Sequence, residues 1–321
     1  MARSAVVICT RSRPDQVVHA CESVIKDRPD AVIVVVDASD DTWTEKKCKE
    51  LASQHPGVQL NYVKADRPGL ARQRNQATLV CERMQIDIVH FIDDDVEVLA
   101  GYFDSIEERF EKDPHLAGVG GAIQNARMEA HPIFNSLFLL SGRYPNTIRR
   151  SGRVVKPEST GGAKRQIGQR PVEWLQGFAM SYRMLTLQKH SFDDRLTGYS
   201  YGEDRDFSFR VSRSGKLAVE PNARCLHLRA TANRLDSRKF GFEVTTRTYA
   251  WVSEYRTEGF SLIAFFWSVF GDVLRHIGAA LINRAGVSED PLWYALGVLE
   301  GVKEIVRSRV KPRVAQSRVP I

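Results

Sequence analysis

The first third of this chain of 321 residues alternates short apolar runs with stretches of helical periodicity. Four runs rich in apolar residues are predicted to be strands, at residues 5–9, 31–36, 58–63 and 86–92. The predicted helices between them begin near Pro14, Thr42 and Leu70. Strands that are apolar throughout are typical of a parallel sheet that is covered on both faces. We therefore predict an α/β fold with a Rossmann-like, mostly parallel central sheet and helices on both of its faces.

The apolar run at residues 86–92 ends in three consecutive aspartates, Asp93, Asp94 and Asp95. Adjacent carboxylates repel one another unless a cation or hydrogen-bond donors hold them. On an extended backbone Asp93 and Asp95 project to the same side, where they form half of a site for a hard divalent cation. Mg²⁺ takes one or two protein carboxylates and completes its shell with water and substrate phosphate. The alternative is a solvated acidic loop after a core strand.

Further polar residues fall at the ends of the neighbouring predicted strands. Asp37 ends the second apolar run, and the helix predicted after the third run begins among Arg67, Arg72, Arg74 and Asn75. Ligands of such sheets bind beyond the carboxyl ends of the strands. Helix N-termini favour anions, and arginine binds phosphate oxygens through two hydrogen bonds. This edge is therefore predicted to bind a nucleotide, with the alternative that some of these arginines are ordinary surface residues.

Composition restricts the ligand and the cellular compartment. The formal net charge of +7 favours an acidic ligand, which can be a phosphate, an anionic lipid or a nucleic acid. Much of the positive charge falls in residues 143–170, a basic loop with eight Lys or Arg residues and one acidic residue. The five cysteines are scattered and show no C-x-x-C spacing, so neither a zinc site nor a disulfide framework is expected. No secretory signal opens the sequence, and we expect a cytoplasmic protein.

A second acidic cluster lies later in the chain. Glu203 and Asp204 follow a glycine and open a predicted helix. Such an acidic pair suits a positioned general base, although carboxylates in a first helical turn often only complement the helix dipole. His227 follows a short predicted strand at residues 217–219 and a predicted turn at 221–222. A single histidine carries little weight by itself.

Taken together, these motifs resemble the family-two glycosyltransferases of the GT-A fold, in particular rhamnosyltransferase-like bacterial members. The resemblance covers about residues 4–230. It rests on six short motifs in the expected order: Arg11-x-Arg13-Pro14, Val-Val-Val-Asp37-Ala-Ser, Ala-Arg72-Gln-Arg74-Asn75, Phe-Ile-Asp-Asp-Asp95, Trp174-x-x-Gly177 with Ser181-Tyr-Arg183, and Gly202-Glu-Asp204. One departure is the Cys9-Thr10 pair, where many members carry proline.

The resemblance implies a role for each matching residue. The nucleotide-binding residues that it implies are Thr10, Arg13, Asp37, Arg67, Arg72, Arg74, Asn75, Asp93 and Asp94. Asp95, with Asp93 and His227, would hold Mn²⁺ or Mg²⁺. Trp174 and Gly177 would border the acceptor pocket. Asp204 would be the catalytic base, and Glu203 beside it would bind acceptor hydroxyls.

The activity implied is inverting transfer of a hexose or deoxyhexose by a single displacement. The expected donor is a UDP-, dTDP- or GDP-linked sugar, and the expected acceptor is a glycan or a lipid-linked glycan, as in polysaccharide biosynthesis. A sugar-phosphate nucleotidyltransferase is the alternative, but it would normally carry a glycine-rich phosphate loop where this chain has Cys9-Thr-Arg-Ser-Arg-Pro14. A nucleic-acid-binding protein is a weaker alternative, because the cations lack interleaved aromatic residues.

The expected domains are a catalytic domain at 1–235, with halves at 1–125 and 126–235, and a helical region at 236–321. In the helical region, the apolar run at 259–271 is interrupted by Asp272 before the roughly 20 residues that a membrane-spanning helix needs. A second helix is predicted from Pro291, followed by a basic tail. Apolar helices followed by cations indicate attachment to the inner face of the cell membrane. Packing on the catalytic domain or in a homodimer is the alternative.

Overall fold

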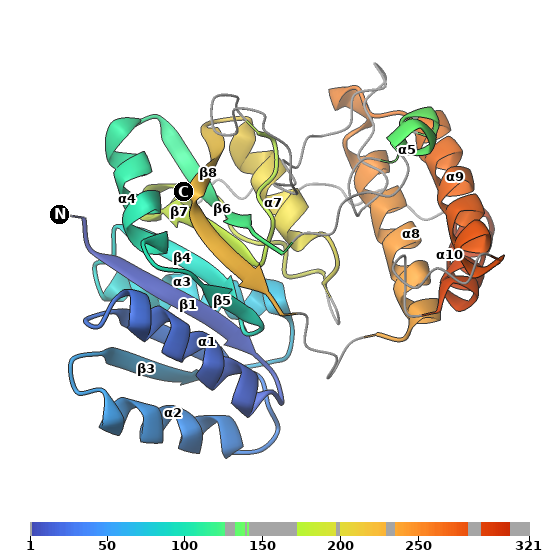
Figure 1. Ribbon diagram of the computed structural model, residues 1–321. Coiled ribbons are helices and arrows are strands. Elements are labelled where there is room, and N and C mark those ends of the chain that lie inside the picture. The colour runs from blue at the N-terminus through green and yellow to red at the C-terminus, as the bar shows by residue number, and fades with distance from the viewer. Residues whose placement is uncertain are drawn as a thin grey trace. The chain divides into compact units, whose positions relative to one another are not determined.

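The computed structural model describes residues 2–125, 132–138, 140, 172–196, 200–228, 235–281 and 290–308. The basic loop at 143–170 and the tail after residue 308 therefore lie outside the described residues. The chain divides into two compact units, which Figure 1 shows with their helices and strands labelled. The first unit is Met1–Met128 with Pro157–Asn233, and the second is Glu129–Lys156 with Arg234–Ile321.

The first unit is built on one sheet of eight strands. In chain order they are β1 (Ser4–Thr10), β2 (Val32–Asp37), β3 (Gln59–Lys64), β4 (Ile88–Asp93), β5 (Val96–Val98), β6 (Leu116–Ile123), β7 (Ala179–Arg183) and β8 (Lys216–His227). Their order across the sheet is β3-β2-β1-β4-β7-β6-β8-β5. The strands β3, β2, β1 and β4 are parallel, whereas β7 runs antiparallel between β4 and β6. All four strands predicted in the first third of the sequence are present.

Helices cover both faces of this sheet, as the continuous apolar runs predicted. They are α1 (Pro14–Asp27), α2 (Trp43–Gln54), α3 (Leu70–Arg83), α4 (Tyr102–Lys112), α6 (Met184–Lys189) and α7 (Glu203–Ser212). Alternate residues of β1 enter two separate cores, Val6 and Ile8 with α1, α2 and α4, and Ala5 and Val7 with α3, α6 and α7. The predicted α/β fold with a two-sided sheet is confirmed.

The register of the sheet brings the predicted site residues to one edge. Thr10 at the end of β1 pairs with Asp37 of β2, and Cys9 pairs with Asp93 of β4. Because parallel strands point the same way, all of these strand ends face the same side of the sheet.

The turn predicted at residues 221–222 is wrong, because β8 runs without interruption from Lys216 to His227. The pairing of β6 with β8 shifts register at this point, from Gly120↔Val219 to Ala122↔Arg224. Pro221 has no amide hydrogen to donate to a neighbouring strand. Strands tolerate a proline where their pairing is irregular, as at this register shift. As a result β8 continues far enough for His227 to pair with Val96 of β5, immediately after Asp95.

The second unit is helical. Its elements are α5 (Pro132–Leu137), α8 (Ser237–Glu254), the 3₁₀ turn η1 (Arg256–Glu258), α9 (Leu262–Leu281) and α10 (Pro291–Ser308). The predicted start of α10 is confirmed, since the Asp290 carboxylate accepts a hydrogen bond from the Trp293 amide at 3.1 Å. Asp272 does not end the apolar helix, which runs for 20 residues. Among the described residues α9 alone is long and apolar enough to cross a membrane, and 39% of its most apolar window is buried.

Candidate functional site

Asp94, the middle aspartate of the triplet, is tied to the residues that follow β1. The Thr10 hydroxyl donates to its Oδ2 at 2.7 Å, and Arg13 Nη1 donates to its Oδ1 at 2.9 Å. The carboxyl group is buried, and burial raises its pKa while Arg13 opposes the shift. Asp94 therefore holds the β1–α1 connection against the end of β4, and three of the predicted nucleotide-binding residues lie together here.

Asp37 is fully buried at the end of β2 and is surrounded by donors. Its carboxylate accepts hydrogen bonds from the Ser39 amide at 2.8 Å, from the Ser39 hydroxyl and from the Tyr62 hydroxyl at 2.9 Å. Gln73 of α3 lies beside it and donates to the carbonyl oxygens of Thr10 and Val36 at 3.0 and 2.9 Å. Ser39, Tyr62 and Gln73 were not predicted as site residues, although Ser39 and Gln73 lie within two of the six motifs.

Arg74 of α3 connects the two acidic clusters. Its guanidinium is buried and donates to Glu203 Oε1 at 2.6 Å through Nη1. Through Nη2 it donates to Asp93 Oδ1 at 3.1 Å and to the Gly177 carbonyl at 2.8 Å. Arg74 was predicted to bind the nucleotide, and in the structure its donors contact protein acceptors. One side chain thus joins the end of β4 to the start of α7.

The two carboxyl groups that Arg74 contacts have raised pKa values. Burial raises the pKa of Glu203 to about 8, with neighbouring Asp204 adding to the shift and Arg74 opposing it. Burial likewise raises the pKa of Asp93 to about 6, again against the effect of Arg74. At both positions, removal of the carboxylate from water raises the pKa by more than the nearby Arg74 guanidinium lowers it. Perturbed carboxyls of this kind are frequent at functional sites.

Asp204 lies next to Glu203 but in a different environment, because it is only half-buried. Its Oδ2 accepts from the Gly177 amide at 2.8 Å and from Trp174 Nε1 at 3.2 Å. The structure therefore brings together Trp174, Gly177 and Asp204. A side chain at position 177 would place its Cβ 3.0 Å from the Asp204 Cβ and 3.3 Å from Arg74 Nη1, so glycine permits this close approach.

Asp95 and His227 meet at the same edge of the sheet. His227 Nε2 lies 3.1 Å from Asp95 Oδ1, and its ring stacks on Phe178 with centroids 5.0 Å apart. Within the described part of the chain no group of three or more His, Cys, Asp or Glu side chains forms a metal site. Nevertheless, a carboxylate and an imidazole nitrogen that already lie in contact fit a divalent cation whose remaining ligands are water and substrate phosphate.

Three further predicted residues are Arg67, Arg72 and Asn75. Arg67 is exposed and Arg72 half-buried, and neither contacts another described residue through a hydrogen bond or an ion pair. Asn75 is directed elsewhere, since its side chain donates to the Phe192 carbonyl and accepts from the Phe192 amide, both at 2.9 Å. Asn75 would have to break both of these hydrogen bonds to reach a nucleotide, so it does not belong to the proposed donor site.

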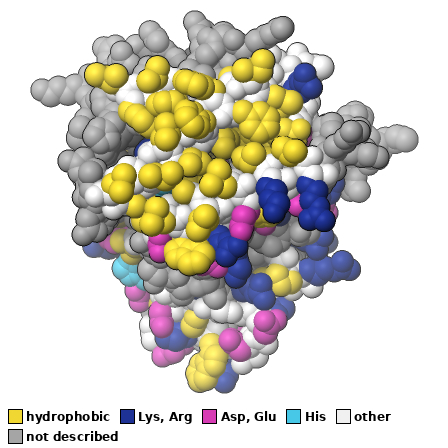
Figure 2. Space-filling view, turned by 90° about the vertical axis from the view of Figure 1, so that its right-hand side faces the viewer, with side chains coloured by type: hydrophobic (Ala, Val, Ile, Leu, Met, Phe, Trp, Pro, Cys, Tyr) yellow, Lys and Arg dark blue, Asp and Glu magenta, His cyan; other side chains and the backbone are white. Residues whose placement is uncertain are grey.

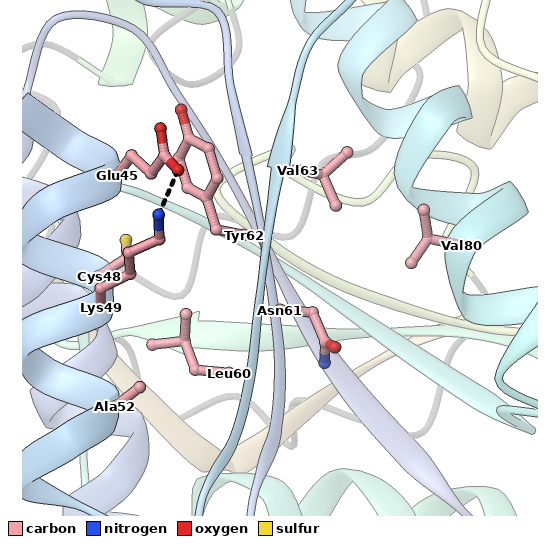
Figure 3. Close-up of a pocket in the computed structure, with 9 residues that line it drawn as sticks. All are labelled: Glu45, Cys48, Lys49, Ala52, Leu60, Asn61, Tyr62, Val63 and Val80. Atoms are coloured by element: carbon pink, nitrogen blue, oxygen red, sulfur yellow. Dashed lines mark hydrogen bonds and ion pairs between the residues drawn. The ribbon is translucent and has the colours of Figure 1, made fainter. Parts of the chain in front are cut away.

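A hollow of about 470 Å³ lies at β3, the edge strand of the sheet, and is lined by residues of α2, β3 and α3 (Figure 3). Its walls include Tyr62 of β3, Val80 of α3 and the ion pair between Lys49 and Glu45 of α2, 2.6 Å apart. No predicted site residue lines it. The candidate site is therefore the edge formed by the ends of β1, β2 and β4 and the start of α7.

Comparison with solved structures defines the class of protein. The fold is that of the GT-A glycosyltransferases, because the structure resembles a mannosyltransferase, PcManGT from Pyrobaculum calidifontis, solved in complex with GDP-Man and Mn²⁺. The TM-score is 0.53 at 13% sequence identity, over 96% of this chain and 88% of that one. S. aureus TarS is similar at a TM-score of 0.49 and 15% identity, over 88% of this chain and 43% of that one.

The family follows from the sequence itself. Residues 5–163 match the model of glycosyl transferase family 2, and over this segment the chain belongs to that family. No curated protein matches the chain. The family and the fold that the six motifs indicated are thereby confirmed, and the protein is a glycosyltransferase.

Proposed function

We propose that this protein moves a hexose or deoxyhexose from a nucleotide-diphosphate donor to an acceptor hydroxyl, with inversion at the anomeric carbon. The observation that carries this proposal is the position of Gly177. Its amide donates to Asp204, and its carbonyl accepts from Arg74, which also binds Asp93. Gly177 therefore connects the proposed base, Asp204, with the edge of the sheet where the donor is proposed to bind. This proximity suits direct transfer of the sugar from donor to acceptor in a single displacement.

Asp204 is the better candidate for the general base. It is half-buried and borders Trp174, whereas Glu203 is buried and bound to Arg74. Asp204 would take the proton from the acceptor hydroxyl as its oxygen bonds to the anomeric carbon. The bond from that carbon to the diphosphate oxygen breaks in the same step, and its electron pair leaves with the diphosphate. General bases of this kind contribute about two to four orders of magnitude in rate.

The donor would lie along the strand ends. Asp37 and Thr10 would face the nucleoside, while Arg67 and Arg72 would offer cations to the diphosphate. Asp95 and His227, with Asp93 beside them, would hold Mn²⁺ or Mg²⁺, which when bound would neutralise charge on the departing diphosphate. A glycan or a lipid-linked glycan would be the acceptor, next to Trp174.

The first test is thermal stabilisation by GDP, UDP and dTDP, each with and without Mn²⁺. A ligand that binds only the folded state raises the melting temperature. We expect a metal-dependent shift with one nucleotide that Asp95→Ala abolishes. The matched control is Asp30→Ala, an exposed aspartate that precedes β2 and so lies at the opposite end of that strand. The absence of a shift with every nucleotide would contradict the donor site.

The second test separates the base from the binding residues. We expect Asp204→Asn to keep the nucleotide-dependent shift and to lose about 10²- to 10⁴-fold in turnover. If turnover fell only after Glu203→Gln, the two roles would have to be exchanged. Product stereochemistry gives an independent check, because retention at the anomeric carbon is incompatible with a single displacement.

A further inference from the structure

The second unit leaves a broad apolar face uncovered on α9 and α10. Exposed large side chains recur at helical spacing on α9, at Phe266, Phe270, Leu274 and Ile277, and on α10 at Trp293 and Leu296. Phe270 is 51% exposed and Trp293 is 48% exposed. Figure 2 shows hydrophobic side chains gathered in one wide patch on this side, with Lys and Arg side chains next to it. Patches of this extent on soluble proteins mark interaction sites.

The opposite face of α9 is buried and includes polar side chains that contact α10. Asp272 is buried in the middle of the helix and accepts hydrogen bonds from Tyr294 of α10 at 3.1 Å and from Arg275 at 2.5 Å. His276 stacks on Tyr294 with ring centroids 4.0 Å apart. Because α9 binds α10 through a buried charged side chain, it is suited to lie against its neighbour with one face outward, and unsuited to cross a bilayer surrounded by lipid.

The apolar stripe of α10 becomes cationic at its C-terminal end. Leu292, Leu296 and Leu299 are followed at helical spacing by Lys303 and Arg307, and all five side chains are exposed. The sequence then continues with further cations and no acidic residue, at Arg309, Lys311, Arg313 and Arg318. Glu300, an acidic residue near this stripe, is paired with Arg238 of α8.

We propose that α9 and α10 dock this protein on an anionic lipid bilayer. The two helices lie in the plane of the interface, with their exposed apolar side chains at the boundary between headgroups and acyl chains. Lys303 and Arg307 contact the phosphates of the headgroups. A bilayer is the occupant that offers apolar depth and negative charge together, whereas a second copy of the chain would bring the same cations to the contact.

The test is flotation of the full-length protein with vesicles, without donor or acceptor, so its result does not depend on the proposed catalytic function. Neutral vesicles contain phosphatidylcholine alone, and anionic vesicles contain about one-third phosphatidylglycerol. We expect the protein to float with anionic vesicles. Phe270→Glu should lower its partition by about 30-fold or more, since burial of one phenylalanine is removed and a charge is added. Leu185→Glu, on α6 at 68% exposure, is the matched control and should float as the wild type does.

The role of the cations needs its own variant. The pair Lys303→Glu and Arg307→Glu should weaken partition onto anionic vesicles by about tenfold or more, with little change on neutral ones. Lys112→Glu on α4, an exposed lysine of the first unit, is the control. Ile263→Glu, at 85% exposure, repeats the apolar test at a position where folding cannot be affected through packing.

Two outcomes overturn the proposal. One is a wild-type protein that stays below both kinds of vesicle. The other is a wild-type dimer by light scattering that Phe270→Glu converts to a monomer while neither protein floats, which would assign the face to a second copy. Failure of this test together with a normal nucleotide-dependent shift would leave the catalytic proposal intact.

Discussion

At the scale of single residues, Arg74 connects parts of the candidate site that no sequence motif predicted to be in contact. It is buried and binds two carboxylates and a carbonyl that come from β4, α7 and the segment before β7. A buried ion pair can be close to neutral overall, because desolvation opposes the attraction between its charges. Loss of one partner is different, because it leaves the other charges buried and unpaired. Arg74 is therefore needed for the positions of Asp93 and Glu203 whether or not a nucleotide touches it.

Above about pH 8, where Glu203 and Asp93 are both ionised, we expect Arg74→Met to destabilise the first unit by about 3–5 kcal/mol, because the two carboxylates lose their counter-charge. Urea unfolding measures this change. Arg72→Met, two residues earlier on the same helix, is the control and should stay within about 0.5 kcal/mol. The double variant Arg74→Met with Glu203→Gln should recover part of the loss. Equal stability of the two single variants would show that the contacts of Arg74 are not needed for folding.

The raised pKa of Glu203 predicts a pH dependence of stability. Burial raises this pKa from its ordinary 4.5 to about 8, so the folded state keeps a proton that the unfolded state has lost between these values. Stability from this residue therefore falls as the pH rises through that window and changes little above it. Relative to Glu203→Gln, the wild type should lose a few kcal/mol between about pH 5 and about pH 8.

Urea titrations of both proteins across that pH range measure the difference. Glu111→Gln, an exposed glutamate on α4, is the control and should follow the wild type. Parallel curves for the wild type and Glu203→Gln would mean that Glu203 titrates alike in the folded and unfolded states.

At the scale of elements, the contact between α8 and α10 depends on glycines. A Cβ at Gly297 would collide with the Arg238 carbonyl oxygen, and one at Gly241 would collide with the Tyr294 carbonyl oxygen. The two helix backbones therefore touch at points where no side chain fits. Glycine in a helix interior costs about 1 kcal/mol relative to alanine, so the close packing must offset this cost.

We expect Gly297→Ala to destabilise the second unit by about 1–3 kcal/mol, because the helices must separate to admit the methyl group. Gly278→Ala is the matched control on α9, where a Cβ would meet nothing within 4 Å. The control should raise stability by about 0.5–1 kcal/mol through helix propensity alone. Thermal unfolding of the two variants decides the matter, and a stabilised Gly297→Ala would show that α8 and α10 do not pack as described.

At the scale of the whole molecule, charge and apolar surface act together. The net charge of +7 attracts the protein to any anionic surface, including nucleic acid. The exposed apolar face of α9 and α10 favours a membrane over nucleic acid, because apolar side chains are stabilised by burial in lipid and not by contact with a phosphate backbone. Salt separates the contribution of charge from that of apolar burial, since the screening length for charges falls from about 10 Å at about 0.1 M salt to about 3 Å at about 1 M.

We expect binding to anionic vesicles to weaken between these salt concentrations without being lost, because burial of apolar surface is not screened. Phe270→Glu should instead be released completely at high salt. Vesicle partition at the two concentrations measures both effects. Complete release of the wild type would mean that charge alone holds it on the membrane.

Much of this protein follows from its sequence. The apolar runs and helical periodicities predict the strands and helices of the first unit, because burial on both faces of a sheet requires that pattern locally. The aspartate triplet and the arginine-rich helix start mark the candidate site because ligands of such sheets bind beyond the carboxyl ends of the strands, and the Glu203–Asp204 pair marks it because such a pair suits a general base. These predictions depend only on residues that are close to one another in the sequence.

The tertiary structure decided which of those residues meet. In the structure Arg74 links Asp93 to Glu203, and Asn75 is hydrogen-bonded to Phe192. The fold also carries β8 through Pro221 to bring His227 to Asp95. Apart from the contact of Arg74 with Asp93, each of these contacts joins residues more than 100 positions apart in the chain. Local pattern cannot predict them, because they depend on strand order and register, which only the packed core determines.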